Sequence, residues 1–127
     1  MKKITTIFIC VDWFYPAYKA GGPVQSIANM IEQFKEEAVV FRVFCSDKDA
    51  DGTKLDITCD KWTVYNNNTH VWYASEATQK RKTIQAEIVK CHPDILFING
   101  IYSWYFNLIP LLFGRAASKI ISARGML

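Results

Sequence analysis

Two adjacent glycines stand where an anion could approach the backbone. Gly21 and Gly22 come directly before a predicted helix, in the loop that follows an apolar run at residues 4–11. The first backbone N–H groups of a helix have no partner within it, and the helix dipole places partial positive charge there. Glycine lets a phosphate come close because it has no side chain. The pair can equally be a simple turn into the helix, with Pro23 at the first helical position, so both interpretations stay open.

The surrounding residues lack the familiar nucleotide-binding patterns. Residues 20–25 read AGGPVQ, which does not fit the G-x-G-x-x-G dinucleotide fingerprint, and the chain has no Walker P-loop. A receiver-type phosphorylation module would need an acidic pair after the first strand and an Asp after a central strand. This chain has Asp12-Trp13 and Asn99 at those places. The sequence therefore disfavours NAD binding of the usual type and a receiver module.

Three carboxylates reproduce the opening of a calcium loop. Asp47, Asp49 and Asp51 precede Gly52 in the spacing D-x-D-x-D-G, but the twelfth position is Thr58 instead of the Glu that would complete the site. The triplet also resembles the D-x-D manganese motif of another transferase class, and its place after a predicted second strand argues against that. We expect these carboxylates to cap turns and predict no metal site.

Histidine offers no strong candidate for a catalytic base. His70 lies beside a predicted strand, and His92 precedes Pro93, where termination of a helix explains it. Neither histidine falls at the carboxyl end of a strand, where a base would be expected in this type of fold.

Aromatic side chains gather in two predicted loops. The group consists of Trp13, Phe14, Tyr15, Tyr18, Tyr102, Trp104 and Tyr105. Aromatic residues dominate both protein cores and the surfaces on which sugars stack. The cluster can therefore be core and rim packing or a platform for a sugar acceptor.

Hydrophobic periodicity predicts the elements that must position these residues. Strands are expected at 4–11, 38–45, 94–98 and 119–122, with weaker extended segments at 62–65 and 70–74. Helices are expected at 24–34, at 76–91 with Ser75 as its cap, and at 103–114 with a bend at Pro110. This alternation predicts an α/β fold, a doubly wound parallel sheet with 94–98 placed centrally. Ligands of such sheets bind beyond the carboxyl ends of the strands.

Composition indicates one water-soluble globular domain spanning residues 1–127. Of the 127 residues, 50% are hydrophobic and 21% are charged, and the net charge of +3 is spread along the chain. No basic stripe indicates a nucleic-acid partner. The four cysteines lack C-x-x-C spacing, so we expect reduced thiols. No apolar run approaches the roughly 18 residues of a membrane-spanning helix, and we predict a cytoplasmic location.

The predicted last strand is followed only by residues 123–127, without a helix to cover it. A parallel sheet is normally covered by helices on both faces. We therefore expect a segment that usually follows this unit to be missing.

Four segments, taken together, resemble the N-terminal domain of family 4 of the retaining, metal-independent GT-B glycosyltransferases. They are FYPAYKAGGPVQSIANMIEQF at 14–34, SDKDADG at 46–52, PDILFINGIYSWY at 93–105 and ISARGML at 121–127. The resemblance implies a Rossmann-like domain that binds the acceptor and faces a second, donor-binding domain. It implies a hexosyltransferase-type enzyme that uses a nucleotide-sugar, needs no cofactor, and glycosylates a glycan or lipid-linked acceptor in cell-surface polysaccharide synthesis.

The resemblance also assigns roles to particular residues. The loop at Gly21 and Gly22 would approach the donor diphosphate. Tyr18, Asn99 and Tyr102 are our predicted acceptor contacts. The assignment of Gly21 and Gly22 to the diphosphate agrees with the anion preference of a helix N-terminus.

Two departures limit what can be transferred from the family. Residues 97–100 read FING where the family stretch is usually H-x-H-G, so a role for those histidines does not carry over. Arg124 stands where many relatives have a histidine near the reacting sugar. Arginine stays protonated and is a poor base, so we predict that it stabilises the leaving diphosphate while that diphosphate helps to accept the proton of the acceptor hydroxyl.

A different class of function stays open. The chain can be a free-standing, non-catalytic, flavodoxin-like module whose aromatic loop contacts a protein partner. Under the transferase interpretation, residues 1–127 alone would be inactive, because catalysis needs donor and acceptor in one cleft. Peripheral contact with the inner face of the membrane through Trp104, Tyr105 or Lys19 also stays open.

Overall fold

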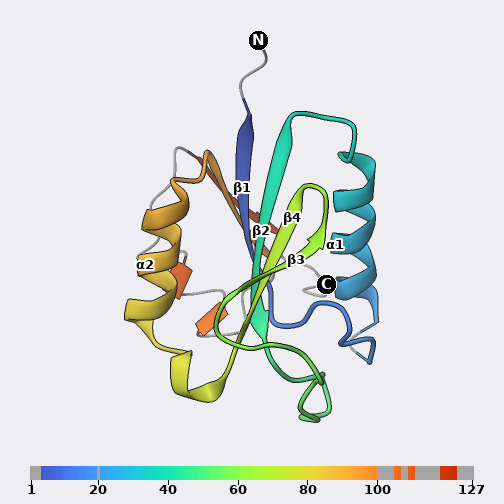
Figure 1. The fold of residues 1–127 in the computed structure, drawn as a ribbon, viewed down its shortest axis with the longest axis vertical. Helices are drawn as coiled ribbons and strands as arrows, with labels where there is room; N and C mark the ends of the chain where they lie inside the picture. The colour runs from blue at the N-terminus through green and yellow to red at the C-terminus, as the bar shows by residue number, and fades with distance from the viewer. Residues whose placement is uncertain (1–3, 20, 100–104, 107–108, 111–117, 123–127) are drawn as a thin grey trace.

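Six strands form one mostly parallel sheet in the described part of the chain. The computed structural model describes residues 4–19, 21–99, 105–106, 109–110 and 118–122. The strands are β1 (Thr5–Cys10), β2 (Val39–Ser46), β3 (Trp62–Asn66), β4 (Thr69–Ala74), β5 (Ile95–Asn99) and β6 (Ser118–Ser122). Their order across the sheet is β3-β4-β2-β1-β5-β6 (Figure 1).

Parallel pairing at the centre of the sheet confirms most of the predicted architecture. β1 runs parallel to β2 and to β5, with Cys10 opposite both Phe44 and Ile98. Only β3 departs from this pattern, because a tight turn after Asn66 folds it back antiparallel to β4. The predicted strand at 94–98 has a neighbour on each side, although β2 and β1 occupy the middle of the sheet.

Helices cover both faces of the sheet. α1 (Gly22–Gln33) packs on one face and α2 (Arg81–Cys91) on the other (Figure 1). Side chains of a strand point alternately to its two faces. Phe8 of β1 accordingly belongs to the core beneath α2, and Ile9 to the core beneath α1. The structure is thus an α/β sandwich with two hydrophobic cores.

The predicted helix at 76–91 is wrong in its first turn. A 3₁₀ turn, η1 (Glu76–Thr78), comes first, and α2 begins only after the extended Lys80. Ser75 does not cap a helix through its side chain, because its hydroxyl donates to the Asp60 carboxylate at 2.8 Å. The Thr78 hydroxyl donates to the same carboxylate. Asp60, which is distant in sequence, therefore holds this segment as a separate turn, although the local sequence favoured one continuous helix.

Part of the predicted apolar helix at 103–114 can be located. Tyr105, Phe106 and Ile109 are buried in the core beneath α2. The rest of that segment, and the bend predicted there, lies outside the described residues. Within the described residues, no helix has the length and apolar character needed to cross a membrane.

Two adjacent residues of α2 test how much the core beneath this helix contributes to the free energy of unfolding. Ile88 is 1% exposed and Val89 is 49% exposed. Ile88→Ala should lower the free energy of unfolding by about 2–5 kcal/mol, because it leaves a cavity. Val89→Ala is the control and should change it by no more than about 0.5 kcal/mol. Urea unfolding measures both, and equal effects would contradict this orientation of α2.

Candidate functional site

The glycine loop opens at the carboxyl edge of the sheet. Gly21 precedes the first residue of α1 with a φ of 68°, in the left-handed region that favours glycine. Its N–H donates to the Tyr18 carbonyl at 3.1 Å. Gly22 is the first residue of α1, and a Cβ built on either glycine would meet no atom of the described residues within 4 Å. The space above both glycines is therefore open.

The amino end of α1 is not neutralised by its own side chains. Its N-cap residue, Gly21, makes no side-chain cap, and its first turn contains no acidic residue. Pro23 has no N–H, so the donors left in the first turn are those of Gly22 and Val24. Fixed N–H groups at the positive end of a helix suit an anion.

A buried carboxylate from the next loop holds the glycine loop in place. Both oxygens of Asp49 accept from the backbone N–H of Lys19, at 3.1 and 3.3 Å, and Asp49 is 5% exposed. The Lys19 ammonium lies 2.6 Å from Asp51. Lys19 is the main reason that the pKa of Asp51 lies well below its ordinary value. The loop after β2 thus fixes the loop after β1.

The third carboxylate of this loop has a separate role. Asp47 is 2% exposed, lies 3.7 Å from the Lys54 ammonium and accepts from the Cys59 thiol at 3.7 Å. Asp49 and Asp51 also accept from the N–H groups of Ala50 and Thr53, which confirms the expected turn capping. Within the described ranges, no three His, Cys, Asp or Glu side chains are grouped so that they could hold a metal ion.

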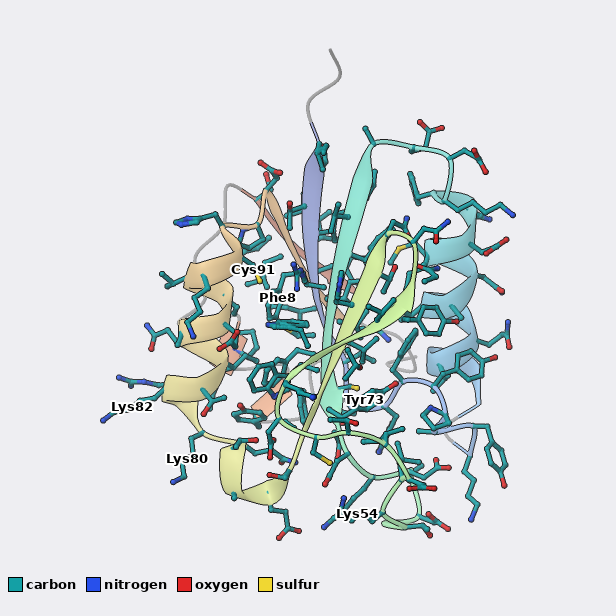
Figure 2. All side chains as sticks on the ribbon, in the orientation of Figure 1. Phe8, Lys54, Tyr73, Lys80, Lys82 and Cys91 are labelled. Atoms are coloured by element: carbon teal, nitrogen blue, oxygen red, sulfur yellow. The ribbon has the colours of Figure 1, made fainter. Side chains whose placement is uncertain are left out.

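A tyrosine from β4 anchors the start of the glycine loop. The Tyr73 hydroxyl donates to the Tyr15 carbonyl, and the Tyr15 hydroxyl donates to Gln25 of α1 at 3.1 Å. Burial raises the pKa of Tyr73 far above its ordinary value, so it stays a protonated donor. Figure 2 shows Tyr73 at the lower end of the sheet, below Phe8. Sequence reasoning missed both Tyr73 and the anchoring role of Asp49, because neither contact is local.

The aromatic residues divide between core and surface. Phe14 is fully buried and its ring centroid lies 5.0 Å from that of Tyr65, while Tyr105 is 9% exposed. Tyr18 is 71% exposed and extends from the same loop. Among the described aromatic residues of the predicted cluster, Tyr18 is therefore the one best placed to meet a ligand.

The structure brings several predicted site residues to one edge. Tyr18 and Gly21 lie in the loop after β1, Gly22 begins α1 directly after that loop, and Asn99 ends the neighbouring β5. Asn99 is only 7% exposed, so a ligand could reach little of its side chain. Tyr102 and Arg124 lie outside the described residues. His70 is the second residue of β4, away from the carboxyl edge as predicted.

No protein-family model, curated protein or solved structure matches this chain.

The anchoring role of Asp49 predicts an asymmetric response to substitution. Asp49→Ala should lower the free energy of unfolding by about 1.5–3 kcal/mol, because it removes charge-assisted hydrogen bonds at a buried carboxylate. It should also speed hydrogen exchange at the Lys19 amide. Asp51→Ala, the exposed control, should have a much smaller effect on the free energy of unfolding and on exchange at the Lys19 amide. Equal effects of the two substitutions would contradict the anchor.

The pairing of Lys19 with Asp51 predicts a change in titration. In Lys19→Met, the pKa of Asp51 should rise toward its ordinary value of 3.8, because its main partner is gone. In the wild type, the lowered pKa of Asp51 stabilises the fold at pH values above the ordinary pKa of Asp. This contribution is lost as the pH falls through the lowered pKa. NMR titration of the Asp51 carboxyl carbon measures the shift, and an unchanged pKa would rule out the pairing.

Proposed function

We propose that this chain is the acceptor-side, Rossmann-like domain of a retaining glycosyltransferase of the GT-B type. In this proposal the whole enzyme, with a second domain, moves a sugar from a nucleotide-sugar to a glycan or lipid-linked acceptor at the cytoplasmic face of the membrane. The observation that carries the proposal is the open, uncapped amino end of α1 at the same edge of the sheet as the end of β5. That arrangement is what a site for a charged leaving group would need.

The chemistry of such a transfer matches what this edge offers. When the anomeric carbon is attacked, negative charge develops on the departing diphosphate. Prearranged N–H donors stabilise developing charge without reorganisation. The N–H of Gly22 is such a donor, and Asp49 keeps its loop in one conformation by binding the Lys19 N–H. In the proposal, Arg124 adds a permanent positive charge to the same task.

The acceptor would contact the exposed part of the same loop. Sugars stack on aromatic rings, and Tyr18 presents one that is 71% exposed. In the proposal, Tyr18 and Tyr102 form this platform, and Asn99 contributes through the small part of it that is exposed. A second domain would bring the nucleotide-sugar, because transfer requires both substrates to be oriented in one cleft.

The proposal is tested by titrating residues 1–127 with UDP and following backbone amide shifts by NMR. We expect the amides of Gly22 and Val24 to shift saturably. Gly22→Ala should weaken binding about tenfold, which corresponds to ~1.4 kcal/mol, because its methyl group would occupy the space for the phosphate. The fold should not change, since a Cβ there contacts nothing within 4 Å.

Gln33→Ala, at the far end of α1, is the matched control and should bind UDP like the wild type. Equal binding by Gly22→Ala and wild type would contradict the proposed diphosphate site. A stable protein whose amides do not respond to UDP or nucleotide-sugars would favour the non-catalytic interaction module.

A further inference from the structure

A separate cavity lies at the opposite, amino-terminal edge of the sheet. Its volume is about 320 Å³, and residues from the first half of β1 and of β2 and from the end of α2 line it. Figure 2 shows Cys91 at this end of α2, next to Phe8 of the sheet. The cavity lining includes Thr6 of β1, Arg42 of β2, Trp62 of β3, and Glu87, Lys90 and Cys91 of α2.

Arg42 presents a cation to this cavity and has no anionic partner among the residues that the structure describes. Its guanidinium carbon lies 5.1 Å from the centroid of the Trp62 ring, and the residue is half-buried. Within the described residues, no carboxylate lies within salt-bridge distance of this guanidinium, and no oxygen accepts a hydrogen bond from it. Contact with an aromatic face fixes the group but leaves its N–H donors unused. The planar fork of arginine is suited to a carboxylate or a phosphate.

The carboxylate among the described lining residues, that of Glu87, is engaged by other groups. Glu87 is 8% exposed and accepts from the Trp62 indole N–H at 2.9 Å. Its other oxygen lies 3.3 Å from the Lys90 ammonium. Glu87 thereby orients the ring on which Arg42 lies, without neutralising Arg42. Two cations and one carboxylate leave a net positive lining.

The neighbouring strand adds no negative charge beside Arg42. His70 of β4 is the register partner of Arg42 and points to the same face of the sheet. Its Nδ1 is buried and has no hydrogen-bond partner within the described residues. Burial, and then the charge of Arg42, lower the pKa of His70, so the ring is neutral near pH 7.

We propose that this cavity binds a small oxyanion, a carboxylate or a phosphate, held by the guanidinium of Arg42 with Lys90 as a second cation. The volume of about 320 Å³ is at the lower end of the range for ligand pockets, so the ligand is a small molecule. The inference is independent of the proposed transferase function, because it concerns the opposite edge of the sheet.

The experiment is an NMR titration of the ¹⁵N-labelled chain with inorganic phosphate and, separately, with succinate. The readouts are the Arg42 side-chain Nε–H and the Trp62 indole N–H. We expect saturable shifts of both signals at constant ionic strength. Saturation with phosphate only, with succinate only or with both supports the site and identifies the preferred oxyanion. Absence of saturation with both overturns the proposal.

Substitutions separate a built site from general charge attraction. Arg42→Gln should weaken binding at least tenfold, and Lys90→Gln should weaken it severalfold. Lys82→Gln is the matched control and should leave binding unchanged, because Figure 2 shows Lys82 at the other end of α2 pointing away from the sheet. Equal weakening by Lys82→Gln and Arg42→Gln would overturn the proposal.

Arg42→Lys provides a second variant that keeps the charge within the sheet. It should bind the oxyanion severalfold more weakly than the wild type, because an ammonium cannot make the paired hydrogen bonds of a guanidinium. Circular dichroism checks that each variant is folded. Binding of Arg42→Lys equal to that of the wild type would overturn the role of the arginine fork.

Discussion

The parallel pairing of β1 with β2 and β5 determines where the polar chemistry of this protein lies. Because these strands run in one direction, their carboxyl ends at Cys10, Ser46 and Asn99 lie at one edge of the sheet. The strand starts lie at the other edge. The interior between them is apolar on both faces, beneath α1 and α2. Polar sites are therefore confined to two separate ends of the sandwich.

The two edges offer anions different kinds of donor. At the carboxyl edge, the donors are backbone N–H groups of α1, and the nearby side-chain charges of Lys19 and Asp51 neutralise each other. At the amino edge, the cavity lining offers the side chain of Arg42, with Lys90 and its partner Glu87 beside it. Backbone donors are fixed by the helix and tolerate little movement, whereas long side chains can adapt to ligands of different shape. The first arrangement suits stabilisation of developing charge, and the second suits simple binding.

Strong periodicity made most of the fold predictable, and contacts between distant residues account for the rest. The apolar runs ending at Val11 and Cys45 predicted β1 and β2 to within about a residue, because buried strands have a clear local signature. The predicted start of α2 was wrong because serine is a typical helix-capping residue, whereas the Ser75 hydroxyl donates a hydrogen bond to Asp60. Asp60 lies 15 residues earlier in the chain, beyond the reach of any local pattern.

The two candidate sites also differ in how far the sequence predicted them. The position of Gly21 and Gly22 followed from the order strand, loop, helix, which the sequence reveals. Arg42 lies in a strand run whose neighbours Phe41 and Val43 are fully buried, where a charge would ordinarily be costly. The cavity beside the first half of β2 resolves the conflict, because it leaves the guanidinium partly open while Trp62 covers its face. A cation in such a buried strand therefore requires an opening beside it. The positive charge of the cation then favours an anion as the ligand of that opening.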